Sequence, residues 1–297
     1  MPELPEVETV RSGLQRLLPG QQIKAVHFDW PKSFPNANAD VNAFVISAKV
    51  TEVKRRAKVL LIELSTNYSL VVHLKMTGQM VYRGSRERFG AGHPNDSLIG
   101  ELPDKSTRVT IDFSDGSQLF FNDQRKFGWV RLLPTPEVMN LDFFKKVGPE
   151  PLSAEFTWQI MRDRMLRRKG SNIKAVLLDQ TVLAGVGNIY ADESLWGAKI
   201  HPSTLTGSLT DKQFKTLYKE LTTVLRLAIE KGGSTDKNYV TAEGKRGSYL
   251  SFAKVFRREK LPCPRCDTTI EKLRVAGRGT HVCPFCQKAP GKVAPGA

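Results

Sequence analysis

Apolar residues near the start of the chain recur at the spacing of a helix. Val7, Val10, Leu14 and Leu17 lie three or four residues apart, and Pro19-Gly20 ends the run. This spacing places the apolar side chains on one face. The pattern therefore predicts an amphipathic helix whose N-terminus carries the acidic residues of the first six positions.

The pattern then changes to short apolar or alternating runs, separated by turn signals such as Asp115-Gly116. The runs predict β-strands at residues 23–28, 41–46, 49–56, 59–64, 69–74, 79–82, 108–113, 118–122 and 128–133. Short strands at this density are typical of an antiparallel sandwich or barrel. Residues 83–107 are polar and glycine-rich without periodicity, so we expect a long surface loop there.

The second half of the chain has a helical period. Prolines around residues 134–151 mark a boundary, and helices are expected over residues 156–168, 173–178 and 209–229 and from Asn188 onward. Residues 234–249 are polar and form a candidate lid. Together these patterns predict an α+β protein, with an N-terminal helix and an antiparallel β-sandwich or barrel followed by a helical domain.

The charge of the chain indicates its partner. Lys and Arg number 45 against 30 Asp and Glu, which gives a net charge of +15. Such a surplus indicates an anionic polymer, most often nucleic acid, although a protein can also be basic without such a partner. The first residues do not resemble a signal peptide, and no apolar run reaches membrane-spanning length. We expect a cytoplasmic protein with no membrane contact.

All four cysteines lie near the end of the chain, as Cys263-Pro-Arg-Cys266 and Cys283-Pro-Phe-Cys286. Paired Cys-x-x-Cys motifs at this separation predict a tetrathiolate site for one structural Zn²⁺. A redox role for the thiols is the alternative, and it fits the paired spacing less well. Residues 272–275 and 280–282 predict a hairpin between the pairs, with Gly277-Arg278-Gly279 at its tip. An arginine there can reach a DNA groove or phosphate, although the tip taken alone also describes an ordinary surface arginine in a turn.

The first six residues carry candidate chemistry. Removal of Met1 would leave Pro2 as a secondary amine, which is partly neutral at neutral pH and can attack an aldehyde carbon to form an iminium ion. Glu3 is placed to transfer protons, and Glu6 would share its helical face. Taken alone, the same residues describe an ordinary solvated terminus with helix-capping acids.

Several motifs together resemble the family of formamidopyrimidine-DNA glycosylase and endonuclease VIII, on the formamidopyrimidine branch. They are Pro-Glu-Leu-Pro-Glu-Val-Glu-Thr at the start, Arg-Arg-Ala-Lys before a strand, His-Leu-x-Met-x-Gly, Arg-Lys-Phe-Gly, Gly-Pro-Glu-Pro, Gly-Val-Gly-Asn-Ile-Tyr and the four-cysteine finger. The resemblance covers residues 2–288. It implies a β-sandwich, a helix–two-turn–helix domain and a C-terminal zinc finger hairpin.

The resemblance also implies roles for individual residues. The catalytic residues would be Pro2 as nucleophile, Glu3, Glu6, Lys58 and Arg278. The residues that bind DNA would be His73, Met76, Arg125, Phe127, Lys169 and Asn188. Met76, Arg125 and Phe127 would fill the gap left by the everted base, with Arg125 facing the orphaned cytosine. A loop that caps the everted purine would contain Ser234, Asp236, Lys237, Asn238 and Tyr239.

The implied protein is a monomeric, bifunctional DNA glycosylase and abasic-site lyase that excises oxidised purines from damaged double-stranded DNA. Its expected parts are a catalytic domain (1–134), a linker (135–151), a helix–two-turn–helix domain (152–232), a capping loop (233–252), a zinc finger (253–288) and a disordered tail (289–297). The chain departs from the family pattern at Lys105-Ser106, in the length of residues 83–107, and at Thr77, where some members carry a glutamate. A non-catalytic zinc-ribbon DNA-binding protein would explain the charge and the cysteines but not the Pro2-Glu3 terminus.

Overall fold

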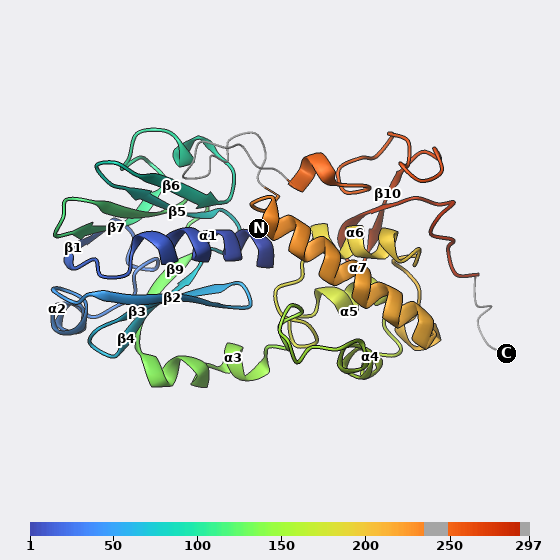
Figure 1. Ribbon diagram of the computed structural model, residues 1–297, viewed down its shortest axis with the longest axis horizontal. Helices are drawn as coiled ribbons and strands as arrows, with labels where there is room; N and C mark the ends of the chain where they lie inside the picture. The colour runs from blue at the N-terminus through green and yellow to red at the C-terminus, as the bar shows by residue number, and fades with distance from the viewer. Residues whose placement is uncertain (235–248, 292–297) are drawn as a thin grey trace. The chain divides into compact units, whose positions relative to one another are not determined.

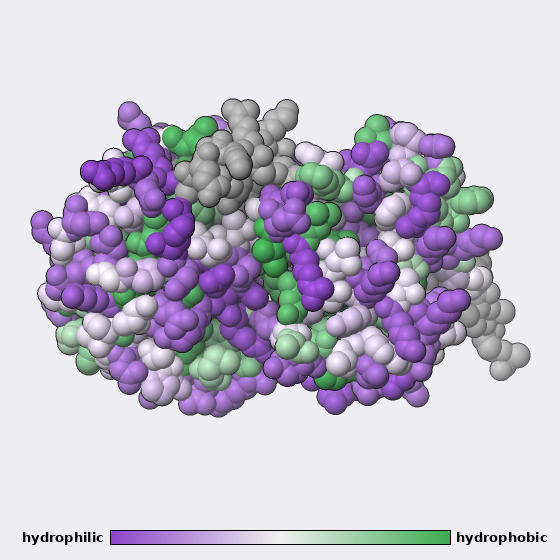
Figure 2. Space-filling view, in the orientation of Figure 1, coloured by the Kyte–Doolittle hydropathy of each residue, from purple (hydrophilic) through white to green (hydrophobic). Residues whose placement is uncertain are grey.

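The computed structural model describes residues 1–234 and 249–291. These residues belong to two compact units. The first is built from residues 1–146 and 228–249, and the second from residues 147–227 and 250–297. Among the described helices, none is long and apolar enough to cross a membrane. Hydrophilic residues cover much of the visible face of each unit (Figure 2), as the composition leads one to expect.

The first unit contains the predicted antiparallel β-sandwich (Figure 1). One sheet has the strand order β1-β7-β8-β5-β6 and the other has the order β2-β3-β4-β9. The strands are β1 (Ile23–Phe28), β2 (Val50–Arg56), β3 (Val59–Leu64), β4 (Tyr68–His73), β5 (Gly78–Arg83), β6 (Arg88–Gly92), β7 (Thr107–Phe113), β8 (Gln118–Asp123) and β9 (Trp129–Pro134). The expected strands 23–28 and 59–64 are confirmed at both ends, and the others, apart from 41–46, shift by one residue.

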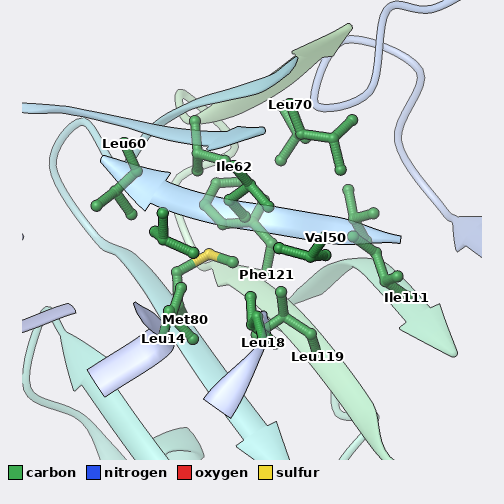
Figure 3. Packing of buried hydrophobic residues seen from close by; sticks show 14 of the residues in the cluster. Leu14, Leu18, Val50, Leu60, Ile62, Leu70, Met80, Ile111, Leu119 and Phe121 are labelled. Atoms are coloured by element: carbon green, nitrogen blue, oxygen red, sulfur yellow. The ribbon is translucent and has the colours of Figure 1, made fainter. Parts of the chain in front are cut away.

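The core of the sandwich lies between the two sheets (Figure 3). Leu60, Ile62 and Leu70 come from the four-stranded sheet, and they meet Met80 and Phe121 of the five-stranded sheet. All five side chains are buried. Burial of an apolar side chain of this size contributes about 1.5–3 kcal/mol, so this layer holds the two sheets together.

Helix α1 (Leu4–Leu17) packs against the outer strand of each sheet, β2 and β6 (Figure 1). The predicted apolar face is confirmed, because Val7, Val10 and Leu14 are all fully buried. The helix approaches β6 closely at Gly13, where an added Cβ would lie 2.1 Å from the ring of Phe89. The sandwich therefore fixes the helix whose N-terminus carries Glu3 and Glu6.

The strand expected at residues 41–46 is wrong, because these residues lie in and just after helix α2 (Asn38–Phe44). Val41 and Val45 lie four residues apart and both are buried, so they share one helical face. A short apolar run cannot distinguish a strand from a buried helix by periodicity alone.

The long surface loop expected at residues 83–107 is also wrong. It contains β6, a short 3₁₀ helix (Asp96–Leu98) and buried side chains, including Phe89 and Leu98. The glycines of β6 permit close packing: an added Cβ at Gly90 would lie 3.1 Å from the carbonyl oxygen of Leu98. The segment therefore covers the outer face of the sheet, where Leu98 packs with Val81 and Phe120.

Buried hydrogen bonds hold this covering segment in place. Ser106 donates through its hydroxyl to Asp104 Oδ1 at 2.7 Å and to Ser97 Oγ at 3.0 Å. Burial alone would raise the pKa of Asp104, but hydrogen bonds from Ser97, Ser106 and Thr107 outweigh it and leave that pKa below its ordinary value. Ser106, one of the departures from the family pattern, thus serves the packing of its own segment.

The second unit is helical and ends in a hairpin. Its helices are α4 (Trp158–Leu166), α5 (Ile173–Leu178), α6 (Asn188–Gly197) and α7 (Asp211–Glu230). The last residues of α7 belong to the first unit, as does the short helix α3 (Asp142–Lys146). Helix α4 begins later than expected because the hydroxyl of Thr157 caps it, accepting the N–H of Ile160.

The predicted zinc-finger hairpin is formed by β10 (Glu271–Val275) and β11 (Arg278–Val282). Its turn residues are Ala276 and Gly277, with φ of 50° and 73°. Two positive φ values in a two-residue turn are the mark of type I′. Arg278 therefore begins β11, paired with Val275, instead of standing at the middle of the tip as expected.

Candidate active site and nucleic-acid interface

The first residues of the chain are buried at the start of α1. Pro2, Glu3 and Glu6 are all buried, with Glu3 and Glu6 each 4% exposed. Glu3 is the N-cap residue, and it forms a capping box with Glu6, whose Oε2 accepts the Glu3 N–H at 2.7 Å. The helix thus holds both carboxylates in the first turn, directly after Pro2 in the sequence.

Glu6 also binds the segment that follows α7. Its Oε1 accepts the N–H of Ser234 at 2.6 Å. Gly233, at φ +83°, leaves room for this contact, because an added Cβ would lie 2.9 Å from the same oxygen. One carboxylate therefore joins the start of α1 to Ser234. The other expected residues of the capping loop, Asp236, Lys237, Asn238 and Tyr239, lie outside the described residues.

Lys58 lies in the turn between β2 and β3, and His73 ends β4, which pairs with β3 in the four-stranded sheet. Lys58 is 6% exposed, and the next residue, Val59, pairs with His73. The Nδ1 atom of His73 accepts the N–H of Lys75 at 3.0 Å, so the proton of the neutral ring lies on Nε2. Burial, assisted by the charges of Lys75 and Lys58, lowers the pKa of His73 to about 3. His73 is therefore a neutral donor beside cationic lysines.

Met76, Arg125 and Phe127 lie in two connections between the sheets. The Met76 turn (residues 74–77) runs from β4 to β5, and the Arg125 loop (residues 124–128) runs back from β8 to β9. His73 pairs with Trp129 at one end of these connections, and Gly78 pairs with Asp123 at the other. The structure thus brings the three predicted residues to the same end of the sandwich.

All three of these side chains are accessible. Met76 is 36% exposed, Phe127 is 54% exposed, and Arg125 is also exposed. The guanidinium of Arg125 lies 4.8 Å from the centre of the Phe127 ring. Exposed apolar side chains at loop tips are the composition of wedges that enter base stacks.

In the second unit, Asn188 begins α6 directly after Gly187. Gln180 holds the preceding turn: its Nε2 donates to the carbonyl of Val186 at 2.8 Å, and its Oε1 accepts the N–H of Gly185 at 2.9 Å. The side chain of Asn188 donates to the carbonyl of Gly279 at 3.0 Å. The helix N-terminus and the hairpin beside Arg278 are therefore linked directly.

A buried ion pair holds the backbone that follows Arg278. Lys174 and Asp192, both 0% exposed, are joined at 2.6 Å. Lys174 Nζ also donates to Thr280 Oγ1 at 2.7 Å, and Asp192 Oδ2 accepts the N–H of His281 at 2.9 Å. Because Lys174 and Asp192 come from α5 and α6, these helices fix the strand on which the exposed Arg278 stands.

The four cysteines form a metal site. Their sulfur atoms all lie within 4.8 Å of one another, and Cys266 Sγ is 3.5 Å from the sulfurs of both Cys283 and Cys286. Tetrahedral zinc with Zn–S bonds of about 2.3 Å needs sulfurs about 3.8 Å apart, so the cluster fits one Zn²⁺. The indole N–H of Trp196 donates to Cys263 Sγ at 3.4 Å. The predicted zinc ligands are confirmed as one cluster.

Of the remaining candidates, Lys169 is exposed just after α4, where its carbonyl accepts the N–H of Gly207. Sequence reasoning missed four residues that position others: the buried Asp123, Lys174 and Asp192, and the half-buried Gln180. Asp123 has a sequence signal, because an aspartate at the start of a polar loop is typical of an Asx turn. In the structure its Oδ1 accepts the N–H of Arg125, two residues later. Lys174 interrupts an otherwise apolar run between Ile173 and Leu178, which also marks it.

A β-sandwich with a proline and two glutamates at the start of its helix, and a zinc-binding hairpin joined to a helical unit, define a class of DNA repair proteins. Residues 1–130 match the Formamidopyrimidine-DNA glycosylase N-terminal domain, residues 147–239 match the Formamidopyrimidine-DNA glycosylase H2TH domain, and residues 260–289 match the zinc finger found in FPG and IleRS. The chain belongs to the formamidopyrimidine-DNA glycosylase family.

Individual relatives are similar over nearly the whole chain. The formamidopyrimidine-DNA glycosylase of Pelotomaculum thermopropionicum is 41% identical, covering 97% of this chain and 99% of the relative. That of Herpetosiphon aurantiacus is 43% identical, with 97% and 100% covered. Among solved structures, the complex of Lactococcus lactis Fpg with DNA containing an abasic site has a TM-score of 0.84 and 33% identity, covering 97% of this chain and 100% of that one. A variant of the Lactococcus lactis protein bound to Fapy-dG containing DNA gives the same TM-score at 34% identity, again with 97% and 100% covered.

Proposed function

We propose that this protein is a bifunctional DNA glycosylase and abasic-site lyase that removes oxidised purines, namely 8-oxoguanine and formamidopyrimidines, from double-stranded DNA. The observation that carries the proposal is the position of Pro2 beside two buried carboxylates at the start of α1. Solved relatives bound to abasic-site and Fapy-dG DNA support the class of substrate. We further propose that the protein acts as a monomer in the cytoplasm, on the nucleoid.

After removal of Met1, the secondary amine of Pro2 attacks C1′ of the damaged nucleotide, and the bond from C1′ to the base breaks. The base leaves with a proton, and opening of the sugar ring gives an iminium ion between Pro2 and C1′. The iminium acidifies the C2′–H bond. Loss of that proton expels the 3′ phosphate, a second elimination expels the 5′ phosphate, and water then releases the sugar fragment.

The two carboxylates differ in their surroundings. Glu6 accepts backbone N–H groups from Glu3 and Ser234, so it is held as a fixed acceptor. We assign to Glu3, the residue bonded to Pro2, the transfer of protons to and from the sugar and the departing base. Glu6 keeps the first turn of α1 in place and adds negative charge near the developing cation.

Phosphates on either side of the lesion are assigned to five residues. Lys58 supplies positive charge, and His73 donates through Nε2–H as a neutral group. We also assign contacts with the phosphates of the damaged DNA strand to Asn188, Arg278 and Lys169. A helix N-terminus such as that of α6 favours a phosphate because its N–H groups point outward. The zinc ion, held by four thiolates, has no open position for catalysis and supports the hairpin.

Met76, Arg125 and Phe127 are assigned to the gap left by the everted base, where Arg125 would donate to the cytosine opposite the lesion. Ser234, Asp236, Lys237, Asn238 and Tyr239 are assigned to the loop that covers the everted purine. Eversion costs a few kcal/mol, and the cost is smallest for a damaged pair, so the energetics of opening favour lesions.

The products of the reaction test this proposal. Incubation with a duplex that contains one 8-oxoguanine opposite cytosine should give a one-nucleotide gap with phosphate at both ends, as gel mobility and mass spectrometry can establish. A 3′ unsaturated aldehyde as the final product would limit the enzyme to one elimination. Intact DNA would contradict the proposed function.

A further inference from the structure

Asp123, at the end of β8, organises the Arg125 loop through a single carboxylate. It is 0% exposed. Its Oδ2 accepts the N–H groups of Phe127 at 2.8 Å and Gly128 at 2.6 Å, and its Oδ1 accepts the N–H of Arg125 at 3.2 Å. A buried carboxylate requires several donors of this kind, and the hydrogen bonds from Phe127 and Gly128 are short. The backbone of the loop is therefore fixed, although the side chains of Arg125 and Phe127 are exposed.

Thr77 connects this anchor to the neighbouring Met76 turn. Its hydroxyl donates to Asp123 Oδ1 and accepts the N–H of Arg125 at 3.1 Å. Thr77 is 8% exposed and directly follows Met76. The next residue, Gly78, allows the turn to close tightly, because an added Cβ would lie 2.3 Å from the carbonyl oxygen of Leu74. One hydroxyl thus contacts both the anchor and the backbone of Arg125.

We propose that Thr77 is a positioning residue that joins the Met76 turn to the Arg125 loop, so that Met76, Arg125 and Phe127 enter the DNA as one preformed wedge. This inference rests on the proposed function, which assigns those three side chains to the gap. Preorganisation matters here because side chains that must be ordered on binding cost affinity, and a displacement of about 1 Å can cost ~10²-fold in activity.

The chain offers closely matched variants for a test. Thr77→Val keeps the shape of the side chain and removes both hydrogen bonds, whereas Thr77→Ser keeps the hydroxyl. Thr107→Val is the control: Thr107 is 9% exposed in the same unit, and its hydroxyl donates to Asn122 and accepts the N–H of Asp104, neither of which belongs to the Met76 turn or the Arg125 loop. If Thr77→Val does not fold, Thr77→Ala, which cannot overpack, takes its place.

The first measurement is the ratio of excision rates with cytosine and with adenine opposite the lesion. Thr77→Val should reduce this ratio by roughly tenfold, since loss of a well-placed arginine contact is worth about 5- to 150-fold in discrimination. Thr77→Ser and Thr107→Val should both retain the parent ratio. In an Arg125→Ala background, Thr77→Val should cause no further loss, because the hydroxyl acts through the arginine.

The second measurement does not depend on the opposite base. A 2-aminopurine placed beside the lesion becomes fluorescent when the wedge unstacks it, and Thr77→Val should slow this rise while Thr77→Ser does not. If Arg125→Ala leaves the excision ratio unchanged, the proposed role of Arg125 is wrong. The fluorescence measurement still tests whether Thr77 links the Met76 turn to the Arg125 loop. If Thr77→Val matches the parent protein in both measurements, the proposed positioning role of Thr77 is contradicted.

Discussion

At the scale of single residues, the site is built from groups whose hydrogen bonds fix their chemical state. Glu6 has two backbone N–H donors, one on each oxygen, from Glu3 and Ser234. His73 has an accepting Nδ1, so it can only donate through Nε2 while neutral. These assignments follow from named contacts, and each can be tested by a substitution that changes one atom or one charge.

We expect Glu3→Gln to separate chemistry from binding. The substitution keeps the shape of the side chain and removes its capacity to take and return a proton. Excision should fall by a factor on the order of 10²–10⁴, with affinity for lesion DNA nearly unchanged. Single-turnover kinetics and a binding titration on the same duplex measure the two quantities. Excision at the parent rate would remove Glu3 from the mechanism.

His73 should make the stability of the protein depend on pH. The unfolded histidine binds a proton below its ordinary pKa of 6.5, whereas the folded one, with a pKa of about 3, stays neutral. Because the unfolded state binds more protons in this window, stability is full above pH 6.5 and is lost as the pH falls toward 3. At pH 5 the loss due to His73 should be about 2 kcal/mol.

Urea unfolding at pH 7 and pH 5 measures this effect. His73→Gln, which retains an acceptor, should lose about 2 kcal/mol less than the parent between the two values. The same exchange at His27, whose side chain is 67% exposed, is the control for the loss of a solvated histidine. An identical pH slope for parent and His73→Gln would mean that the imidazole is not held neutral.

At the scale of elements, the sequence predicts those parts in which local pattern and burial agree. Helix α1 follows from the periodicity of its apolar face, and strand β3 follows from a short run rich in β-branched and apolar residues. Strand β6 could not be predicted, since its glycines disfavour a strand locally and are explained only by the segment that packs over them. For α2, the apolar run at residues 41–46 is too short to show whether its period is that of a helix or of a strand.

The same limit applies to the site. The cysteines, Pro2 and the wedge residues carry chemistry that their residue types reveal. Asp192, which positions the hairpin, reveals its role only through a partner brought close by folding: it meets His281 across 89 positions of sequence. The turn of the hairpin was misplaced because Gly277-Arg278-Gly279 does not show which residues take positive φ.

The hairpin element provides its own prediction. A finger of this size has little core, so zinc binding and local folding should be coupled. Cys266→Ser should release the metal and weaken DNA binding, while the β-sandwich still unfolds cooperatively. Arg278→Ala should weaken DNA binding while the protein keeps its zinc. This result would distinguish the DNA contact of Arg278 from the support that zinc gives to the hairpin. Elemental analysis measures zinc, and absence of zinc from the intact protein would contradict the site.

At the scale of the whole molecule, the net charge of +15 explains attraction to DNA but not catalysis. A basic protein with a zinc finger could bind DNA and do nothing further. What distinguishes an enzyme here is the terminus, where a proline follows the initiator methionine and precedes two buried glutamates. The account therefore depends most on whether the nitrogen of Pro2 becomes a free amine.

Borohydride trapping on a lesion duplex tests this point most directly. With Met1 removed, the Pro2 nitrogen is a secondary amine; with a residue before it, the nitrogen is an amide without an available lone pair. The processed protein should have a mass lacking one methionine and give a covalent adduct with DNA. A form blocked by an extra residue should bind the duplex and give no adduct, excision or strand cleavage. Equal trapping by both forms would contradict the account and point to another amine, with Lys58 examined first.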